Sequence, residues 1–188
     1  ADGALRGAEL AADKHGAVMR MTKPLQDFII QFDVKLDGAK STSLSINDPK
    51  GHLARIAVAP TSVRVTKDDH DKTGPDKAEI FGNLKADIQP GAWTTVRMEI
   101  VGDTMLAKAG EIVACGTHEQ LAGPKSNFGL TVAGETASFR NFKVWEATRN
   151  PDWEAVKAAL PKCEPVPAPA PRAVTAKKPV PAKKPAAK

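Results

Sequence analysis

The alternation of apolar and polar residues is the feature that most constrains the fold of this chain. Within residues 28–36 every second residue is a large apolar one, namely Phe28, Ile30, Phe32, Val34 and Leu36. This pattern is typical of a strand with one face in a core and one in water. The same reading fits residues 42–47, 54–58, 62–66, 94–102, 128–132 and 137–147. We therefore expect a fold built from short amphipathic strands.

Turn-forming residues separate these strands. Glycine, proline, asparagine and aspartate gather at residues 37–38, 47–51, 59–61, 74–75, 89–91, 102–103 and 133–135. Strands at intervals of roughly 8–12 residues with such punctuation favour an antiparallel sandwich or barrel. The sequence predicts an all-β, two-sheet antiparallel β-sandwich of jelly-roll type over residues 1–150.

Three local patterns refine this prediction. Residues 103–116 form a hairpin with its turn at residues 109–111. The apolar phase slips by one at Arg140 and Asn141, which predicts a β-bulge. Residues 151–160 predict a short closing helix that Asp152 can cap.

The basic character of the chain belongs to its last segment. The formal net charge is +5, but residues 161–188 hold seven basic side chains, one glutamate and eight of the fifteen prolines. We expect this tail to be extended, polyproline-rich and disordered. It could contact anionic envelope polymers, or nucleic acid as a third hypothesis. The remaining residues show no basic groove, so nucleic-acid binding is not favoured.

The cysteines and the apolar runs bear on the compartment. Cys115 and Cys163 are the two cysteines, which implies no disulfide framework, and Cys115 reads as a small buried hydrophobe. No apolar run approaches the ~20 residues that span a bilayer. If the protein is exported, we expect its signal to have been removed before residue 1.

Three stretches, residues 1–7, 91–116 and 126–147, resemble the 3-keto-disaccharide hydrolase domain family among the concanavalin-like and laminin-G-like jelly rolls. The shared features are Gly-x-Trp before an alternating strand, a Gly-Asp hairpin, Phe-Gly-Leu, and Phe-Arg-Asn-Phe-x-Val-Trp. The resemblance implies an exported bacterial protein, periplasmic or secreted, that binds a sugar on its concave sheet and acts on 3-keto sugars. The alternative is a non-catalytic carbohydrate-binding or envelope-structural module, and the sequence leaves the enzyme question open.

The segment from Asn47 to Arg55 is the first candidate site. His52 could act as a general base near neutral pH, while Asn47, Asp48 and Arg55 could bind substrate. On a regular strand His52 and Arg55 point to opposite faces. The structural alternative is that His52 bonds a turn carbonyl and Arg55 pairs with a cross-strand acid such as Glu99.

A second candidate base is His118, which follows a glycine turn and is accompanied by Lys125 as a candidate substrate-binding residue. In family terms this loop would overhang the concave sheet. The commoner role of such a histidine is capping or surface exposure.

The stretch from Thr66 to Lys77 contains four aspartates. Asp68, Asp69 and Asp71 could supply oxygen ligands to Ca²⁺ or another divalent cation, although the spacing is not that of an EF-hand. A solvated hairpin tip and a substrate-facing loop are the alternatives, the first being the commoner, and His70 is expected to be exposed.

The carboxylate pattern and the tryptophans complete the candidates. The Glu-x-Asp-x-x-Glu strand of jelly-roll glucanases is absent, which argues against an ordinary two-carboxylate glycosidase. Trp93, Trp145 and Trp153 could stack on sugar rings, but their positions favour packing in the core or at its rim.

Overall fold

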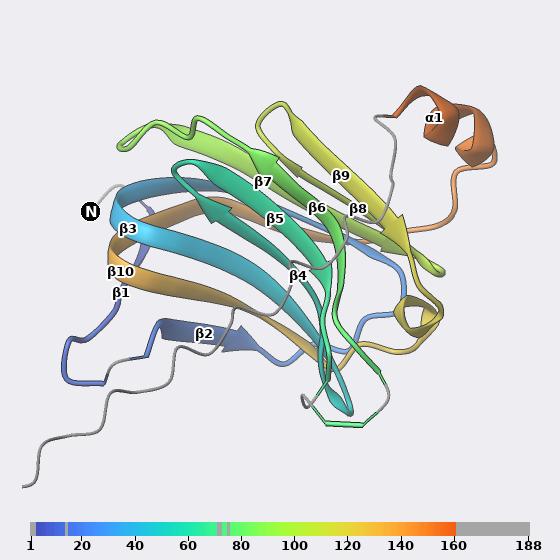
Figure 1. Cartoon of the computed structure of the whole chain (residues 1–188), viewed down its shortest axis with the longest axis horizontal. Coiled ribbons are helices and arrows are strands. Elements are labelled where there is room, and N and C mark those ends of the chain that lie inside the picture. The colour runs from blue at the N-terminus through green and yellow to red at the C-terminus, as the bar shows by residue number, and fades with distance from the viewer. Residues whose placement is uncertain (1–2, 14, 71–72, 75, 161–188) are drawn as a thin grey trace, which may run out of the picture.

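The computed structural model describes residues 3–13, 15–70, 73–74 and 76–160. The predicted tail, residues 161–188, lies outside this part of the chain. The described residues form an antiparallel β-sandwich with one short α-helix, as predicted (Figure 1). The elements are β1 (Leu5–Ala8), β2 (Ala17–Met21), β3 (Phe28–Asp48), β4 (Gly51–Ala59), β5 (Ser62–Lys67), β6 (Glu79–Lys85), β7 (Trp93–Val101), β8 (Thr104–Ala109), β9 (Ile112–Thr117), the 3-10 helix η1 (Glu119–Ala122), β10 (Asn127–Glu146) and α1 (Trp153–Ala159).

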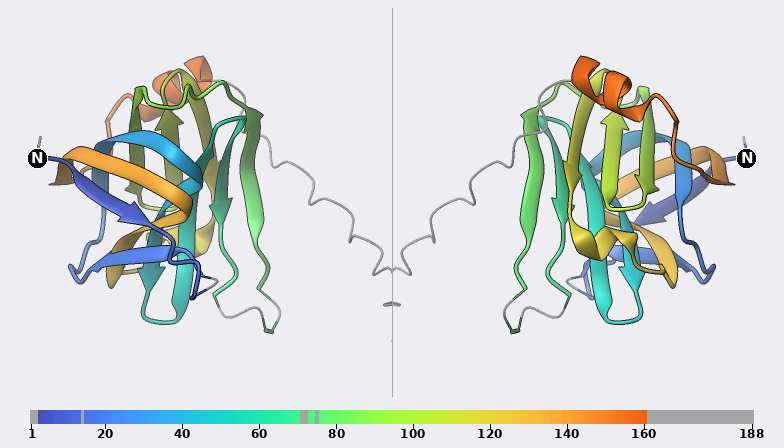
Figure 2. Two further views of the ribbon diagram at one scale, coloured as in Figure 1. Left: turned by 90° about the vertical axis from the view of Figure 1, so that its left-hand side faces the viewer. Right: turned by 90° about the vertical axis from the view of Figure 1, so that its right-hand side faces the viewer.

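Two long strands, β3 and β10, belong to both layers. They pair with each other almost from end to end, while β7 flanks residues 28–35 of β3 and β4 flanks residues 42–48. Sheet I therefore contains β9, β8, β7, the first half of β3, the second half of β10, and β1. Sheet II contains β6, β5, β4, the second half of β3, the first half of β10, and β2. Figure 2 shows the two layers and the strands that cross between them.

The turns predicted at residues 37–38 and 133–135 are wrong, because the chain does not reverse there. Gly38 and Gly134 have φ of 90° and 85° and lie within the continuous strands β3 and β10. The ladder between the two strands shifts its register at residues 133–137. Glycine thus bends each strand from one sheet into the other, since it adopts positive φ without a steric penalty.

The core fills the space between the sheets and confirms the predicted alternation. Phe28, Ile30, Phe32, Val34 and Leu36 are all buried. The predicted bulge is also confirmed: the register shifts between Arg140 and Lys143, and Asn141 has φ of 53°. The Phe142 ring consequently stacks between Phe32, at 5.5 Å, and Phe128, at 5.9 Å between centroids.

The remaining elements close the sandwich. The predicted hairpin is present as β8 and β9, whereas β1, β2 and β6 were not predicted. β6 and β9 approach so closely that a Cβ on Gly82 would lie 2.6 Å from the Ala114 Cβ. α1 begins after Asp152, but the Asp152 side chain forms no capping hydrogen bond, contrary to expectation. No helix in the described ranges is long and apolar enough to cross a membrane.

Replacing Gly134 by alanine tests the bend in β10. The new Cβ would lie 2.9 Å from the backbone nitrogen of Lys40, in addition to the strain of positive φ. We expect a loss of about 2–5 kcal/mol in the free energy of unfolding, measured by urea titration. The control, Gly91→Ala, has φ of 77° and open space around the Cβ, so only about 1–2 kcal/mol should be lost. Equal losses in the two variants would contradict the close approach.

Candidate functional site

A β-bulge in β4 places His52 and Arg55 on the same face of sheet II. Arg55 stands opposite Ser45 and Ala54 opposite Ile46, but the next pair joins Asn47 to His52, so Leu53 is the extra residue. Ser45 and Asn47 are themselves buried polar residues, but they alternate with the core residue Ile46, so their side chains point to the outer face, and their partners do the same. The prediction that His52 and Arg55 point to opposite faces is therefore wrong, because the strand is not regular.

A polar network fixes His52 at the edge of this face. His52 Nδ1 lies 2.8 Å from Asn47 Oδ1, and the Asn47 amide donates to Asn127 Oδ1 at 2.6 Å. The Asn127 amide in turn donates to the Ser126 hydroxyl at 3.0 Å. The His52 ring is thus held by an amide side chain, while the His52 backbone N–H donates to the His70 carbonyl at 3.4 Å. The other ring nitrogen, His52 Nε2, forms no hydrogen bond within the described part of the chain, and His52 is an exposed residue.

Arg55 faces Asp68, not Glu99. Arg55 Nη2 lies 3.0 Å from Asp68 Oδ2, whereas Glu99 pairs with Arg97 on the other sheet. Thr66 donates to the second carboxylate oxygen, Asp68 Oδ1, at 2.7 Å. The contact with Arg55 lacks the alignment of a hydrogen bond, so Arg55 Nε and Asp68 Oδ2 are both buried without a hydrogen-bond partner among the described residues.

The aspartate stretch is tied to the β3–β4 hairpin through His70. His70 Nε2 lies 2.8 Å from Asp48 Oδ2, and Nδ1 lies 3.0 Å from Asp76 Oδ2. Its side chain is 8% exposed, so the expectation of an exposed histidine is wrong. Asp48 also accepts hydrogen bonds from the backbone N–H groups of Lys50 and Gly51. These contacts hold the β3–β4 and β5–β6 connections together at the end of the sandwich opposite α1 (Figure 2).

Lys67 holds the same β5–β6 loop through its side chain. Its side chain is fully buried, and its ammonium lies 3.3 Å from Asp76 Oδ2 and 3.1 Å from the carbonyl of Lys77. Desolvation raises the pKa of Asp76, but Lys67 and His70 outweigh it and hold that pKa below its usual range. Asp76 is therefore ionised at neutral pH and neutralises a buried ammonium.

The described residues contain no group of three or more His, Cys, Asp or Glu side chains that could hold a metal ion. Asp68 faces Arg55, and Asp71 lies outside the described residues, so Asp68, Asp69 and Asp71 are not seen as a joint ligand set. The divalent cation stays a prediction from the sequence.

His118 and Lys125 occupy structural positions. His118 Nδ1 accepts a hydrogen bond from the backbone of Gln120 at the start of η1, and Nε2 lies 3.5 Å from Glu79 Oε1. Lys125 is buried and donates to the Gln26 carbonyl at 2.7 Å. Burial lowers the pKa of Lys125, with nearby Asp27 opposing the shift. No described contact joins either residue to His52 or Arg55.

The tryptophans lie on the side of sheet I, and none is in the buried core. Trp93 is covered by the Arg140 guanidinium, 4.0 Å from its ring centroid, and Trp145 is 41% exposed. The prediction was packing in the core or at its rim, and the half-buried Trp93 and Trp153 lie outside the core. The clustering of the tryptophans on one sheet could not be read from the sequence. Cys115 is buried, but it is disulfide-bonded, which the sequence prediction missed.

Comparison with known proteins identifies the fold. No family model and no curated protein matches the sequence. Among solved structures the chain is similar to the carbohydrate-binding module CBM66 of Bacillus subtilis, with TM-score 0.57 and 17% identity over 76% of this chain and 86% of that one. Chicken galectin 2 has TM-score 0.53 and 11% identity, covering 69% of this chain and 100% of its own. A tetrameric galectin from the sponge Cinachyrella sp. has TM-score 0.52 and 16% identity over 69% and 99%. The chain thus shares the fold of carbohydrate-binding β-sandwiches.

The Asp76 contacts predict an acid-sensitive loop. Folding lowers the pKa of the Asp76 carboxyl below its unfolded value, near 3.8, so its ionised form stabilises the folded protein at pH values above 3.8. This stabilisation is lost as the pH falls through the pKa of Asp76 in the folded protein. We expect Asp76→Asn to lower the melting temperature at pH 7 and to reduce its dependence on pH below about 4. Differential scanning calorimetry at pH 7 and pH 3 measures both. The exposed Asp13→Asn variant should match the unmodified protein, and an Asp76→Asn variant that does so would refute the role of this carboxylate.

Proposed function

We propose that this protein is a carbohydrate-binding module whose site is the outer face of sheet II around Asn47, His52, Arg55 and Asp68. The observation that carries the proposal is the ion pair of Arg55 with Asp68, in which Arg55 Nη2 lies 3.0 Å from Asp68 Oδ2 and the Arg55 side chain is 38% exposed on this face. Because both side chains of the pair remain partly exposed, they offer a ligand a charged donor and a charged acceptor side by side. A sugar hydroxyl can accept from the guanidinium and donate to the carboxylate at once.

The surroundings of this pair suit a flat, polar ligand. Ser43 and Ala57 stand opposite each other next to the pair of Ser45 and Arg55, and these small side chains leave a low floor on the sheet. Arg64 stands opposite Ala57 and is exposed at the far side of that floor. Polar side chains therefore border a shallow surface from two sides. The resemblance of the fold to CBM66 and to galectins agrees with a sugar as the ligand.

An extracytoplasmic location is part of the proposal. A disulfide at Cys115 supports it, because such bonds persist in oxidising compartments and are rare in the cytosol. The only other cysteine of the sequence, Cys163, lies outside the described residues. The basic segment 161–188 would then meet anionic polymers of the cell envelope rather than nucleic acid.

Replacing Arg55 tests the binding site. Screening a glycan array and then titrating a bound glycan by calorimetry should show binding that Arg55→Ala weakens by about 10- to 100-fold, as expected for hydrogen bonds to a charged group. Arg140→Ala is the matched control, because Arg140 is also a half-exposed arginine beside an aspartate, Asp33, but on sheet I. Binding that is unchanged in Arg55→Ala, or no binding by the unmodified protein to any glycan, would refute the site.

Hydrolysis of 3-keto-disaccharides is the narrower hypothesis, and one observation favours it. His52 presents a ring nitrogen without a partner on the same face as Arg55, while Asn47 fixes the ring from the other side. A base so placed could remove the proton that a neighbouring ketone makes acidic.

Mass spectrometry can decide this hypothesis. Cleavage of 3-keto-disaccharides but not of their unoxidised parents is expected, with at least about a 100-fold loss in His52→Ala. His118→Ala, a change at the η1 cap, should retain the activity. Binding without cleavage would leave the carbohydrate-binding function in place and refute the hydrolase.

A further inference from the structure

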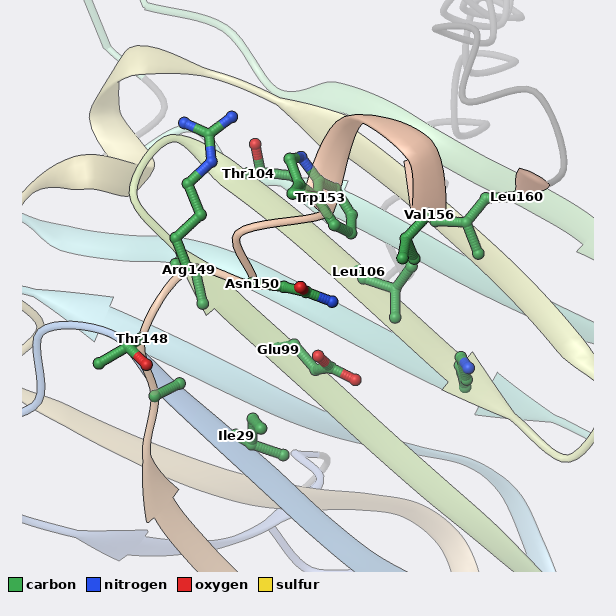
Figure 3. A pocket seen from close by; sticks show the side chains of 13 residues that line it. Ile29, Glu99, Thr104, Leu106, Thr148, Arg149, Asn150, Trp153, Val156 and Leu160 are labelled. Atoms are coloured by element: carbon green, nitrogen blue, oxygen red, sulfur yellow. The ribbon is translucent and has the colours of Figure 1, made fainter. Parts of the chain in front are cut away.

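A cavity of about 220 Å³ lies on the opposite side of the molecule, between the outer face of sheet I and the segment that contains α1 (Figure 3). β7 and β8 form its floor, and Ile29 of β3 extends that floor. Trp153, Val156 and Leu160 cover it from above. The helix contributes no buried residue of its own, so its inward side is left facing this space.

The floor offers three kinds of contact in sequence along one strand. Thr104, Leu106 and Lys108 are alternate residues of β8, and all three line the cavity. They present a hydroxyl group, an apolar side chain and an ammonium group at intervals of about 7 Å. Lys108 has no salt-bridge or hydrogen-bond partner within the described part of the chain. The Lys108 ammonium can therefore pair with an anionic group of a ligand in this cavity.

The walls provide hydrogen-bonding atoms that the protein does not use fully. Glu99 accepts a hydrogen bond from Arg97 through Oε1, which leaves Oε2 for another donor. Asn150 accepts from the backbone of Asp152 through Oδ1, which leaves its amide N–H groups. In Figure 3 the side chains of Glu99 and Asn150 lie between Ile29 and Trp153, with Leu106 beside Asn150. Polar and apolar side chains thus line the same cavity.

We propose that this cavity is a second ligand site, for an acidic sugar of the hexuronate class. Trp153 and Leu106 would contact the apolar C–H face of the pyranose ring. Hydroxyl groups would donate to Glu99 Oε2 and accept from Asn150, and the carboxylate would pair with Lys108. A fatty acid would leave the polar atoms of Glu99 and Asn150 unpaired, and a neutral hexose would leave the Lys108 ammonium unused. The site does not depend on the one proposed on sheet II.

Nuclear magnetic resonance titration of the full chain with methyl glucuronide and with methyl glucoside tests the proposal. The glucuronide should shift the backbone signals of Thr104, Leu106 and Asn150 and the Trp153 indole N–H, and it should bind about 10-fold more tightly than the glucoside. Lys108→Met should remove that preference. Lys143→Met, a change on sheet I outside the cavity, should retain it.

Two further variants separate this site from the first and from misfolding. Val156→Trp fills the cavity from a half-exposed helix position, so the fold should persist while the glucuronide shifts disappear. Arg55→Ala should leave them intact. Shifts confined to Ser45, Arg55 and Thr66, equal affinity for the two glycosides, or no shifts at all would each refute the second site, whatever the outcome on sheet II.

Discussion

The pairing of β3 with β10 is the constraint on which the rest of the structure depends. Because each strand contributes to both sheets, their shared ladder fixes where β1, β2, β4 and β7 join the two layers. The bends at Gly38 and Gly134 lie near each other in that ladder, so both strands turn at the same place. One end of β3 then carries Asn47 and Asp48 to the sheet II site, and the other carries Ile29 to the cavity on sheet I.

The β-bulges at Asn141 and at Leu53 change which side chains of β10 and β4 face the core. The bulge at Asn141 could be predicted because the apolar period itself slips there, and the structure confirms it. The bulge at Leu53 left a weaker signal, since Leu53 is a single apolar residue out of phase between His52 and Ala54. The prediction assumed that the alternation continues unbroken through Leu53, and it therefore placed the His52 side chain on the wrong face of the sheet. The extra residue Leu53 thus places His52 beside Arg55 in the proposed site on sheet II.

The sequence predicted local features better than long-range ones. Strands with a clear alternation and the β8–β9 hairpin were found, because both follow from neighbouring residues. β1 and β2 are short, and their alternation is visible only when β10 is known to lie beside them. Glycines that bend a strand look the same in sequence as glycines that end one. Arg55 meets Asp68 across the β4–β5 hairpin, where Arg55 stands opposite Thr66. The contact of His70 with Asp48 requires loops from different hairpins to meet, so no local pattern encodes it.

The outer faces of the two sheets carry different kinds of side chain. Sheet II is crossed by small side chains and bordered by Arg55 and Arg64, so a ligand at the proposed site would be held by hydrogen bonds. Sheet I carries all three tryptophans on or beside it, and the C-terminal segment encloses a cavity over β7 and β8. Because a β-sandwich exposes the outer faces of both sheets, ligands on opposite sides cannot compete for the same atoms. If both proposed sites bind sugars, they would engage separate points of one polymer, and the second contact would then be intramolecular.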